Sequence, residues 1–181
     1  MSDIWLISDP HFDHNNFLKF TNDDGTKCRP FDTIEDMNEL IIQNCITRVK
    51  HQDKFYWLGD ITMRPNQLGR IMSRIPGHKR LIGGNHDQLQ DFELTRWFEK
   101  VGIWRIFKEE NFVASHVPMH YDCFRHKVQY NVHGHTHGKH IMIGSGKTYR
   151  RDPRYVNISV ENTDYGPLHI EEIKALFQPL D

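Results

Sequence analysis

The chain has 181 residues, of which 38% are hydrophobic and 26% are charged, as is usual for a soluble globular protein. Its formal net charge of −1 excludes the global positive field of a non-specific nucleic-acid binder. The length fits one domain over residues 1–181, and no run reaches the roughly 18–20 apolar residues of a membrane span. Three widely spaced cysteines indicate neither a disulfide framework nor a zinc knuckle.

Short runs rich in aromatic and branched residues have the length of β-strands. In chain order they are Ile4–Ser8, Phe55–Leu58, Arg80–Ile82, Phe112–Ser115, Val128–Val132 and Tyr155–Val160. Apolar residues at near-helical spacing predict a helix that begins after Asp32-Thr33 and ends at about Val49. Shorter helices are predicted around Leu68, Ile71 and Met72 and over Phe92–Phe98. Strands that alternate with helices indicate an α/β fold.

Three segments lack a periodic pattern and are expected to be irregular: Asn22–Pro30, Pro118–Lys127 and Gly138–Arg154. The last of them is rich in Lys and Arg. It is either a solvated loop or a surface that steers phosphate groups toward the protein.

Most of the predicted strands end directly in a polar cluster. The clusters are Asp9-Pro10-His11, Gly59-Asp60, Gly84-Asn85-His86-Asp87, His116 and Gly134-His135-Thr136-His137. Imidazole, carboxylate and carboxamide groups bind divalent metals, and residues at strand ends can converge at one rim of a sheet. One such cluster alone is typical of an ordinary turn, but the ordered set, together with a total of 13 histidines, predicts a two-metal hydrolase site.

This order of motifs, D-x-H, G-D, G-N-H-D, H and G-H-x-H, resembles the calcineurin-like metallophosphoesterase superfamily. The similarity covers most of the chain and is strongest to a compact bacterial and phage-type branch. The resemblance implies a four-layer sandwich of two mixed β-sheets flanked by helices. It also implies one metal on Asp9, His11, Asp60 and His137 and a second on Asp60, Asn85, His116 and His135. Asp60 would bridge the two ions.

By the same resemblance, a metal-bridging hydroxide attacks phosphorus, His86 faces the substrate, and Asp87 orients the His86 ring. The chain is too short for a large capping domain, so an open site that cleaves a phosphodiester is expected. The substrate would be a small or cyclic nucleotide or a nucleic-acid end. Alternatives are a phosphomonoesterase acting on nucleotides or a phosphoprotein, and a non-catalytic metal-bound scaffold module.

Nitrogen and oxygen ligands suit Mn²⁺, Fe²⁺, Co²⁺, Ni²⁺ or Zn²⁺ better than Ca²⁺, and Mn²⁺ is the working choice. Further candidates for substrate contact, each with an ordinary surface role as its alternative, are His14, His120, Arg125, Lys147 and Arg150. Without a signal peptide or membrane span, a cytoplasmic location is expected, in the host cytoplasm if a phage encodes the chain. The sequence leaves the oligomeric state open.

Overall fold

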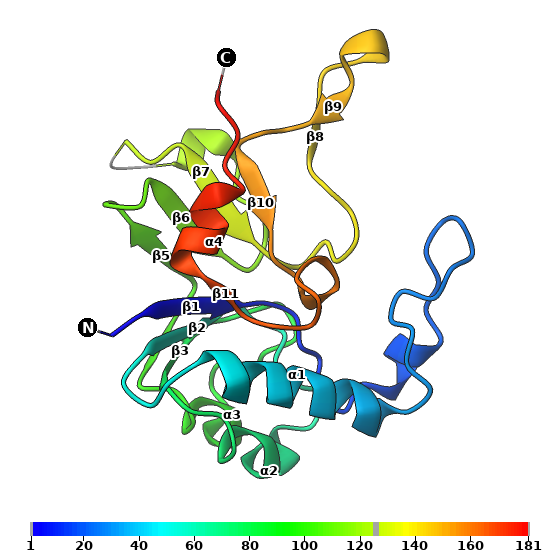
Figure 1. Ribbon diagram of the computed structural model, residues 1–181, viewed down its shortest axis with the longest axis vertical. Coiled ribbons are helices and arrows are strands. Elements are labelled where there is room, and N and C mark those ends of the chain that lie inside the picture. The colour runs from blue at the N-terminus through cyan, green and yellow to red at the C-terminus, as the bar shows by residue number, and fades with distance from the viewer. Residues whose placement is uncertain (1, 125–126, 181) are drawn as a thin grey trace.

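Two mixed β-sheets form the centre of the protein (Figure 1). The computed structural model describes residues 2–124 and 127–180. In the first sheet the strand order is β11-β1-β2-β3-β4, with β1 to β4 parallel and β11 antiparallel to β1. Its strands are β1 (Ile4–Ile7), β2 (Lys54–Trp57), β3 (His78–Ile82), β4 (Lys100–Gly102) and β11 (Leu168–His169).

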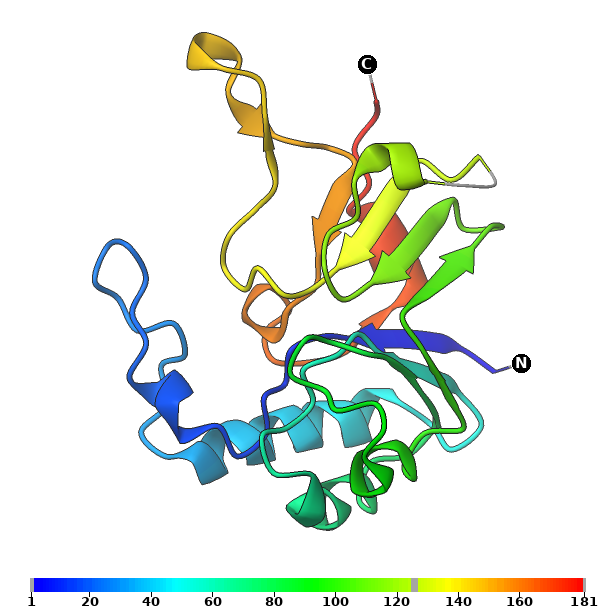
Figure 2. The ribbon, with the colours of Figure 1, turned by 180° about the vertical axis from the view of Figure 1, so that it is seen from behind.

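The second sheet has the order β10-β7-β6-β5, in which β6, β7 and β10 are parallel and β5 is antiparallel to β6. Its strands are β5 (Trp104–Phe107), β6 (Phe112–Ser115), β7 (Tyr130–His133) and β10 (Tyr155–Asn157). A separate hairpin of β8 (Met142–Ile143) and β9 (Arg150–Arg151) projects from the body of the molecule as an arm (Figure 2). We call residues 140–152 the β8–β9 arm.

Helices α1 (Ile34–Arg48), α2 (Gly69–Met72) and α3 (Phe92–Thr95) lie on one side of the first sheet, and α4 (Ile170–Ala175) lies against the second (Figure 1). The Thr33 side chain caps α1 by accepting a hydrogen bond from the Asp36 backbone N–H at 3.1 Å. Val49 is the C-terminal cap, so the predicted first helix is confirmed. Among the described residues, no helix has both the length and the apolar character to cross a membrane.

The first sheet separates two hydrophobic cores, because successive side chains of a strand point to opposite faces. One face presents Ile7, Phe55, Trp57 and Leu81 to the core shared with α1, α2 and α3. The other face presents Leu6, Tyr56, Leu58 and Ile82 to the core shared with the second sheet and α4. The two sheets therefore face each other, and the helices α1 to α3 cover the first sheet from outside.

The outer face of the second sheet has a different cover. Ile106 and Val113, which alternate with the core residues of β5 and β6, line a cavity of about 190 Å³ together with Met119 and Cys123. Residues of the 118–124 segment, which includes the 3₁₀ turn Tyr121–Cys123, thus lie over this face. The α/β class predicted from the sequence is confirmed.

Several element boundaries differ from the predictions. The expected strand Tyr155–Val160 ends at Asn157, and the chain then forms a 3₁₀ turn over Val160–Asn162. The prediction of an irregular Gly138–Arg154 segment is wrong for β8 and β9, which pair through Met142 with Arg151 and Ile143 with Arg150. Strands β4, β5 and β11 and helix α4 were not predicted from the sequence.

The second core depends on a fully buried phenyl ring. Phe112 is 0% exposed and stacks on Phe107 with ring centroids 4.7 Å apart. We expect Phe112→Ala to lower the free energy of unfolding by about 3–5 kcal/mol, because it leaves a cavity in close-packed surroundings. Denaturant unfolding measures this change. Phe92→Ala is the matched control, since Phe92 is 69% exposed, and an equal loss in both variants would contradict the core assignment.

Candidate metal centre

The polar clusters predicted from the sequence lie at the C-terminal ends of parallel strands. Asp9 and His11 follow β1, Asp60 follows β2, Asn85 and His86 follow β3, His116 follows β6, and His135 and His137 follow β7. Strands β1 to β3 belong to the first sheet and β6 and β7 to the second, so the clusters gather where the two sheets meet. Crevices at the carboxyl ends of parallel strands are the usual place of α/β ligand sites.

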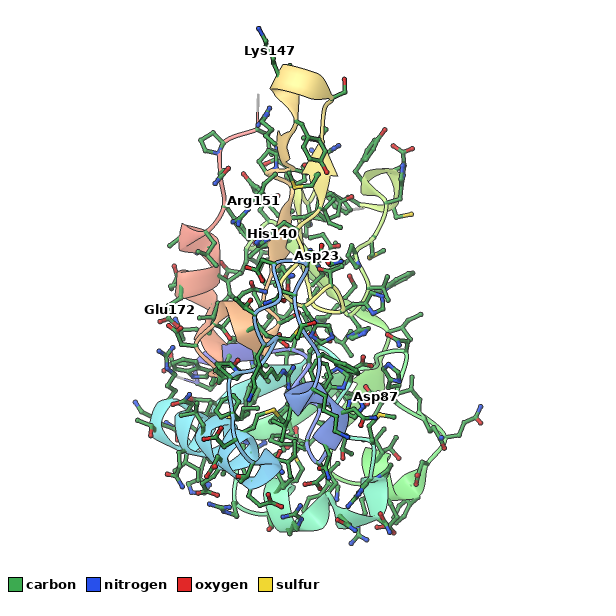
Figure 3. The ribbon with its side chains drawn as sticks, turned by 90° about the vertical axis from the view of Figure 1, so that its right-hand side faces the viewer. Asp23, Asp87, His140, Lys147, Arg151 and Glu172 are labelled. Carbon is green, nitrogen blue, oxygen red and sulfur yellow. The ribbon has the colours of Figure 1, made fainter. Side chains whose placement is uncertain are left out.

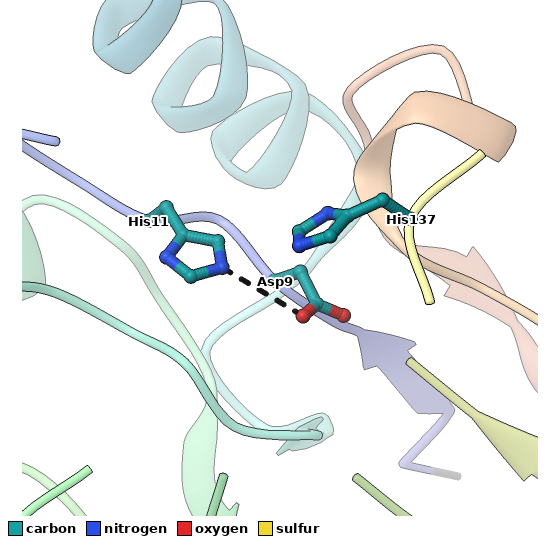
Figure 4. A group of neighbouring side chains, drawn as sticks. All are labelled: Asp9, His11 and His137. Atoms are coloured by element: carbon teal, nitrogen blue, oxygen red, sulfur yellow. Dashed lines mark ion pairs between the residues drawn. The ribbon is translucent and has the colours of Figure 1, made fainter. Parts of the chain in front are cut away.

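Six of the seven predicted ligands form two compact groups. In the first, one ligand atom each from Asp9, His11 and His137 lie within 4.8 Å of one another, and Figure 4 shows these side chains around a common point. The second group, with the same spacing, contains Asp60, His116 and His135. Each group could hold a metal ion.

The carboxylate of Asp60 lies between the two groups. Its Oδ2 is 3.5 Å from His11 Nε2 in the first group and 3.4 Å from His116 Nε2 in the second. The seventh predicted ligand, Asn85, places its Oδ1 2.9 Å from the same His116 nitrogen. One carboxylate oxygen is thus within reach of both groups, which is the geometry required of a bridging ligand.

Buried atoms without partners face this centre. Asp9 Oδ2 accepts hydrogen bonds from Ser8 Oγ at 2.6 Å, the His135 backbone N–H at 2.9 Å and Ser159 Oγ at 3.0 Å. In contrast, Asp9 Oδ1 and both ring nitrogens of His11 are buried without a hydrogen-bond partner among the described residues. Buried polar atoms are normally paired, and a divalent cation would satisfy Asp9 Oδ1 and the one ring nitrogen of neutral His11 that carries a lone pair. The residues present therefore fit a metal centre.

The protonation states favour ligands with free lone pairs. Burial, reinforced by the charge of Arg29, lowers the pKa of His11 to about 2, which leaves the ring neutral. Burial raises the pKa of Asp60, but the hydrogen bond and charge of His116 outweigh it and lower this pKa to about 2. For His116, burial disfavours the proton, yet Asp60 and Asp9 raise the pKa, so a metal that binds this ring must displace a proton.

Two histidines are oriented through Nδ1. His116 Nδ1 lies 2.7 Å from the Leu58 carbonyl oxygen, and His137 Nδ1 lies 3.0 Å from Glu161 Oε1. When Nδ1 carries the proton and donates it to these oxygens, Nε2 is left with a free lone pair. Metal-binding histidines commonly have such a partner on their second nitrogen, because it fixes the ring orientation.

The backbone around the centre is folded tightly. Left-handed φ angles occur at Asp9 (56°), His11 (47°), Asp60 (52°), His135 (66°) and His137 (50°). This conformation costs a non-glycine residue about 1 kcal/mol or more and is held only where the surrounding structure enforces it. The Asp9 and His11 backbone N–H groups donate to the carbonyls of Gly59 and Asp60, at 3.2 and 3.0 Å. Because of these turns, the side chains of Asp9 and His11, which are two positions apart, can point to the same group of ligand atoms.

Glycines allow the loops to approach the carboxylates. A Cβ at Gly134 would lie 2.1 Å from Asp9 Oδ2, and one at Gly84 would lie 2.2 Å from Asp60 Oδ1. Any side chain at either position would push the backbone away from the acidic group. The glycines of the G-H-x-H and G-N-H-D motifs are thus required by close packing around Asp9 and Asp60.

A buried ion pair supports the first group and was not predicted from the sequence. The Arg29 guanidinium is 0% exposed, lies 2.7 Å from Glu161 Oε1, and donates to the carbonyl oxygens of Asp9 and Pro10 at 2.6 and 2.8 Å. Glu161 in turn holds His137. Glu161 follows no motif and stands 24 residues after its partner, so only the folded chain shows its role.

The structure contradicts the predicted role of Asp87. Both of its oxygens accept backbone hydrogen bonds, from Gly84 and Asp60 at 2.9 and 2.8 Å and from Ile61 at 3.0 Å. Asp87 therefore ties the loop after β3 to the loop after β2, and no described contact joins it to the His86 ring. His86 itself is 45% exposed, with Nε2 4.0 Å from Asp60 Oδ2.

The further candidates for substrate contact are scattered. His14 lies beside the centre, with its ring centroid 5.5 Å from that of His11. His120 instead contacts Tyr121 and Asp122. The other two described candidates, Lys147 and Arg150, belong to the β8–β9 arm, with Lys147 at its outer tip (Figure 3). Arg125 lies outside the described residues.

The Arg29–Glu161 pair gives a stability prediction. Arg29→Met removes the buried guanidinium and leaves the Glu161 carboxylate without its charge partner, so we expect a loss of about 3–5 kcal/mol in unfolding free energy. Chemical denaturation in the presence of a chelator measures the loss without any contribution from metal. Arg74→Met, which breaks the exposed pair with Glu39, is the control and should leave the midpoint nearly unchanged. Equal midpoints for the two variants would contradict the role given to Arg29.

No protein-family model matches the chain. The chain is 30% identical to the uncharacterized protein MJ1445 of Methanocaldococcus jannaschii, over 98% of this chain and 93% of the relative. It is 28% identical to the Gene 66 protein of Mycobacterium phage L5, over 70% of this chain and 60% of that protein. The crystal structure of AQ665, a protein of unknown function from Aquifex aeolicus, matches with a TM-score of 0.71 and 26% identity, over 97% of this chain and all of AQ665. At this identity and coverage, the chain belongs to the same protein family as MJ1445.

Proposed function

We propose that this protein is a metal-dependent phosphoesterase with two divalent metal ions, Mn²⁺ being favoured. The residues that would hold one ion are Asp9, His11, Asp60 and His137, and those for the other are Asp60, Asn85, His116 and His135. The bound ions would supply charge neutralisation for the phosphate and a nucleophile at neutral pH. The predicted four-layer calcineurin-like sandwich is part of this proposal, supported by two mixed sheets that face each other.

The position of Asp60 carries the proposal. Its Oδ2 lies at nearly equal distances from His11 Nε2 and His116 Nε2, 3.5 and 3.4 Å, and each of these rings belongs to a different group. A structural turn has no need of a buried carboxylate shared between two sets of imidazoles. A dinuclear centre does need one, because the shared anion offsets the repulsion between two divalent cations.

His86 would act on the substrate. In hydrolysis the oxygen of water bonds to phosphorus while the bond to the leaving oxygen breaks, and the leaving oxygen needs a proton. The exposed His86 ring reaches over Asp60 from the solvent side, where it can donate that proton or stabilise negative charge on the phosphate. His14, whose ring centroid lies 5.5 Å from that of His11, can donate a hydrogen bond to the same phosphate.

A phosphodiester is the favoured substrate. His86 and the second-sheet ligands His135 and His137 are partly or fully accessible, which supports a site open to extended substrates such as a nucleotide or a nucleic-acid end. A phosphomonoesterase is the alternative within the same chemistry. A scaffold that binds metal without catalysis is the alternative from another class, and His86, which belongs to neither ligand group, argues against it.

The proposal predicts chelator-sensitive hydrolysis. Mn²⁺-loaded protein should cleave bis-p-nitrophenyl phosphate faster than p-nitrophenyl phosphate, and excess EDTA should abolish both activities because the nucleophile depends on the metal. Release of nitrophenolate measures turnover. Preference for the monoester would replace the diesterase assignment with the phosphatase. Absence of turnover with both substrates, tested with Mn²⁺, Fe²⁺, Co²⁺, Ni²⁺ and Zn²⁺, would refute the enzymatic proposal.

Variants at Asp60 and His86 should separate metal binding from chemistry. We expect Asp60→Asn to reduce Mn²⁺ binding to fewer than two ions per chain, because the shared carboxylate is lost. His86→Ala should keep two ions and lower kcat by roughly 10²–10⁴-fold, the range for loss of an acid–base group. Isothermal titration measures the first effect and steady-state kinetics the second. His51→Ala, an exposed histidine on the turn after α1, is the control.

Two results would contradict these roles. Two Mn²⁺ ions bound normally to Asp60→Asn would exclude the bridging role of Asp60. Unchanged kcat in His86→Ala, with His51→Ala also unchanged, would remove His86 from the reaction while leaving the metal centre intact.

A further inference from the structure

A second candidate site lies away from the metal centre, at the edge of the first sheet where β4 continues into β5. It is a cavity of about 360 Å³, within the usual size range of small-molecule sites. Its chemically distinctive lining residues are Lys54, Tyr56, Arg80, Lys100, Trp104 and Arg105. None of the metal-centre residues lines it. Lys54 is the first residue of β2, whereas Asp60 follows the end of this strand. The two sites therefore lie at opposite ends of β2.

The lining concentrates positive charge. In the part of the chain that the structure describes, the side chains of Lys54, Arg80, Lys100 and Arg105 form no ion pair and no hydrogen bond, and Arg80 Nη1 is buried without a partner. The neighbouring carboxylate Glu99 lies 2.5 Å from His78 Nδ1, and its pKa is lowered first by this hydrogen bond and further by the charges of His78, Arg80 and Lys100, so it offsets only part of the positive charge. Four cations around one cavity repel each other, and a buried guanidinium nitrogen without an acceptor is costly. A multivalent anion would relieve both costs.

One aromatic ring supports the cationic lining. Tyr56 is only 7% exposed, and Arg80 Cζ lies 5.3 Å from the centroid of its ring. Trp104 alternates with Arg105 on β5, so its side chain lies with Ile106 in the cavity on the outer face of the second sheet. The cationic lining therefore matches a molecule with several linked phosphate groups, because each phosphate can pair with a cation.

We propose that this cavity binds an oligophosphate chain, either free or as part of a nucleotide, with its phosphates held by Arg80, Lys54, Lys100 and Arg105. The site is distinct from the metal centre and does not depend on the proposed phosphoesterase activity. Because β2 and β3 contribute residues to both sites, the ligand contacts the same strands that carry Asp60 and Asn85.

The test is calorimetric titration of the EDTA-treated protein with ATP and ADP, and with inorganic triphosphate. EDTA removes metal from the catalytic centre, so the result is independent of whether that centre hydrolyses phosphate esters. We expect one triphosphate ligand per chain. Arg80→Gln and Lys100→Gln should each weaken the binding of inorganic triphosphate about tenfold, the effect of losing one charge-assisted hydrogen bond. Trp104→Leu should leave this binding unchanged, because the Trp104 side chain lies on the other face of β5. Tighter binding of ATP would identify a nucleotide as the source of the phosphates, and equal affinity would identify a free oligophosphate.

Lys27→Gln is the matched control, because it removes one exposed cation that does not line the cavity and should leave the affinity for inorganic triphosphate unchanged. Absence of ATP, ADP and triphosphate binding up to millimolar concentration would overturn the proposal. Affinity that is equal in wild type, Arg80→Gln and Lys100→Gln would overturn it as well, since binding would then lie elsewhere.

Discussion

The candidate centre depends on the hydrogen bonds that meet at one oxygen of Asp9. Its Oδ2 accepts from Ser8 at the end of β1, from the His135 backbone after β7 and from Ser159 after β10, and thereby joins the ends of both sheets. Hydrogen bonds to a buried carboxylate contribute about 1.5–3 kcal/mol each. These hydrogen bonds occupy Oδ2. The other oxygen, Oδ1, has no hydrogen-bond partner among the described residues and faces the centre. One residue thus fixes the sheet junction and supplies a ligand atom.

The strain at the centre is maintained by this junction and by the buried pair beneath it. Left-handed backbone at Asp9 and His11 would relax if the chain were free, but Arg29 holds the carbonyl oxygens of Asp9 and Pro10 from inside the protein. Glu161 neutralises Arg29 and orients His137 with the same oxygen. Removing either charge would leave the other buried and uncompensated. The side chains of the first candidate group are therefore held in place by the protein's own contacts.

The features of the site that the sequence predicts are those carried by residues close together in the chain. The ligand clusters are short motifs at the ends of apolar runs, so their residues and their convergence at strand ends could be inferred. The Arg29–Glu161 pair joins residues 132 positions apart, and no periodic pattern connects them. Asp87 was misassigned because its partners are backbone N–H groups, which every residue carries and no sequence pattern reveals. Strands β4 and β5 share one apolar run that contains no turn signal except Gly102.

The cationic cavity could not be predicted from the amino-acid composition, because its residues come together only in the folded chain. With 23 basic and 24 acidic residues the chain is nearly neutral, so its net charge predicts no global positive field. Screening limits electrostatic attraction to about 8–10 Å at physiological salt, so an anion responds to the charges around its binding site and hardly to the net charge. Folding places Lys54, Arg80 and Lys100 from three different strands around one space, while Glu99 is turned to His78. A local field of this kind arises from strand register alone, because Lys54 pairs with His78 and Arg80 with Lys100 across neighbouring strands.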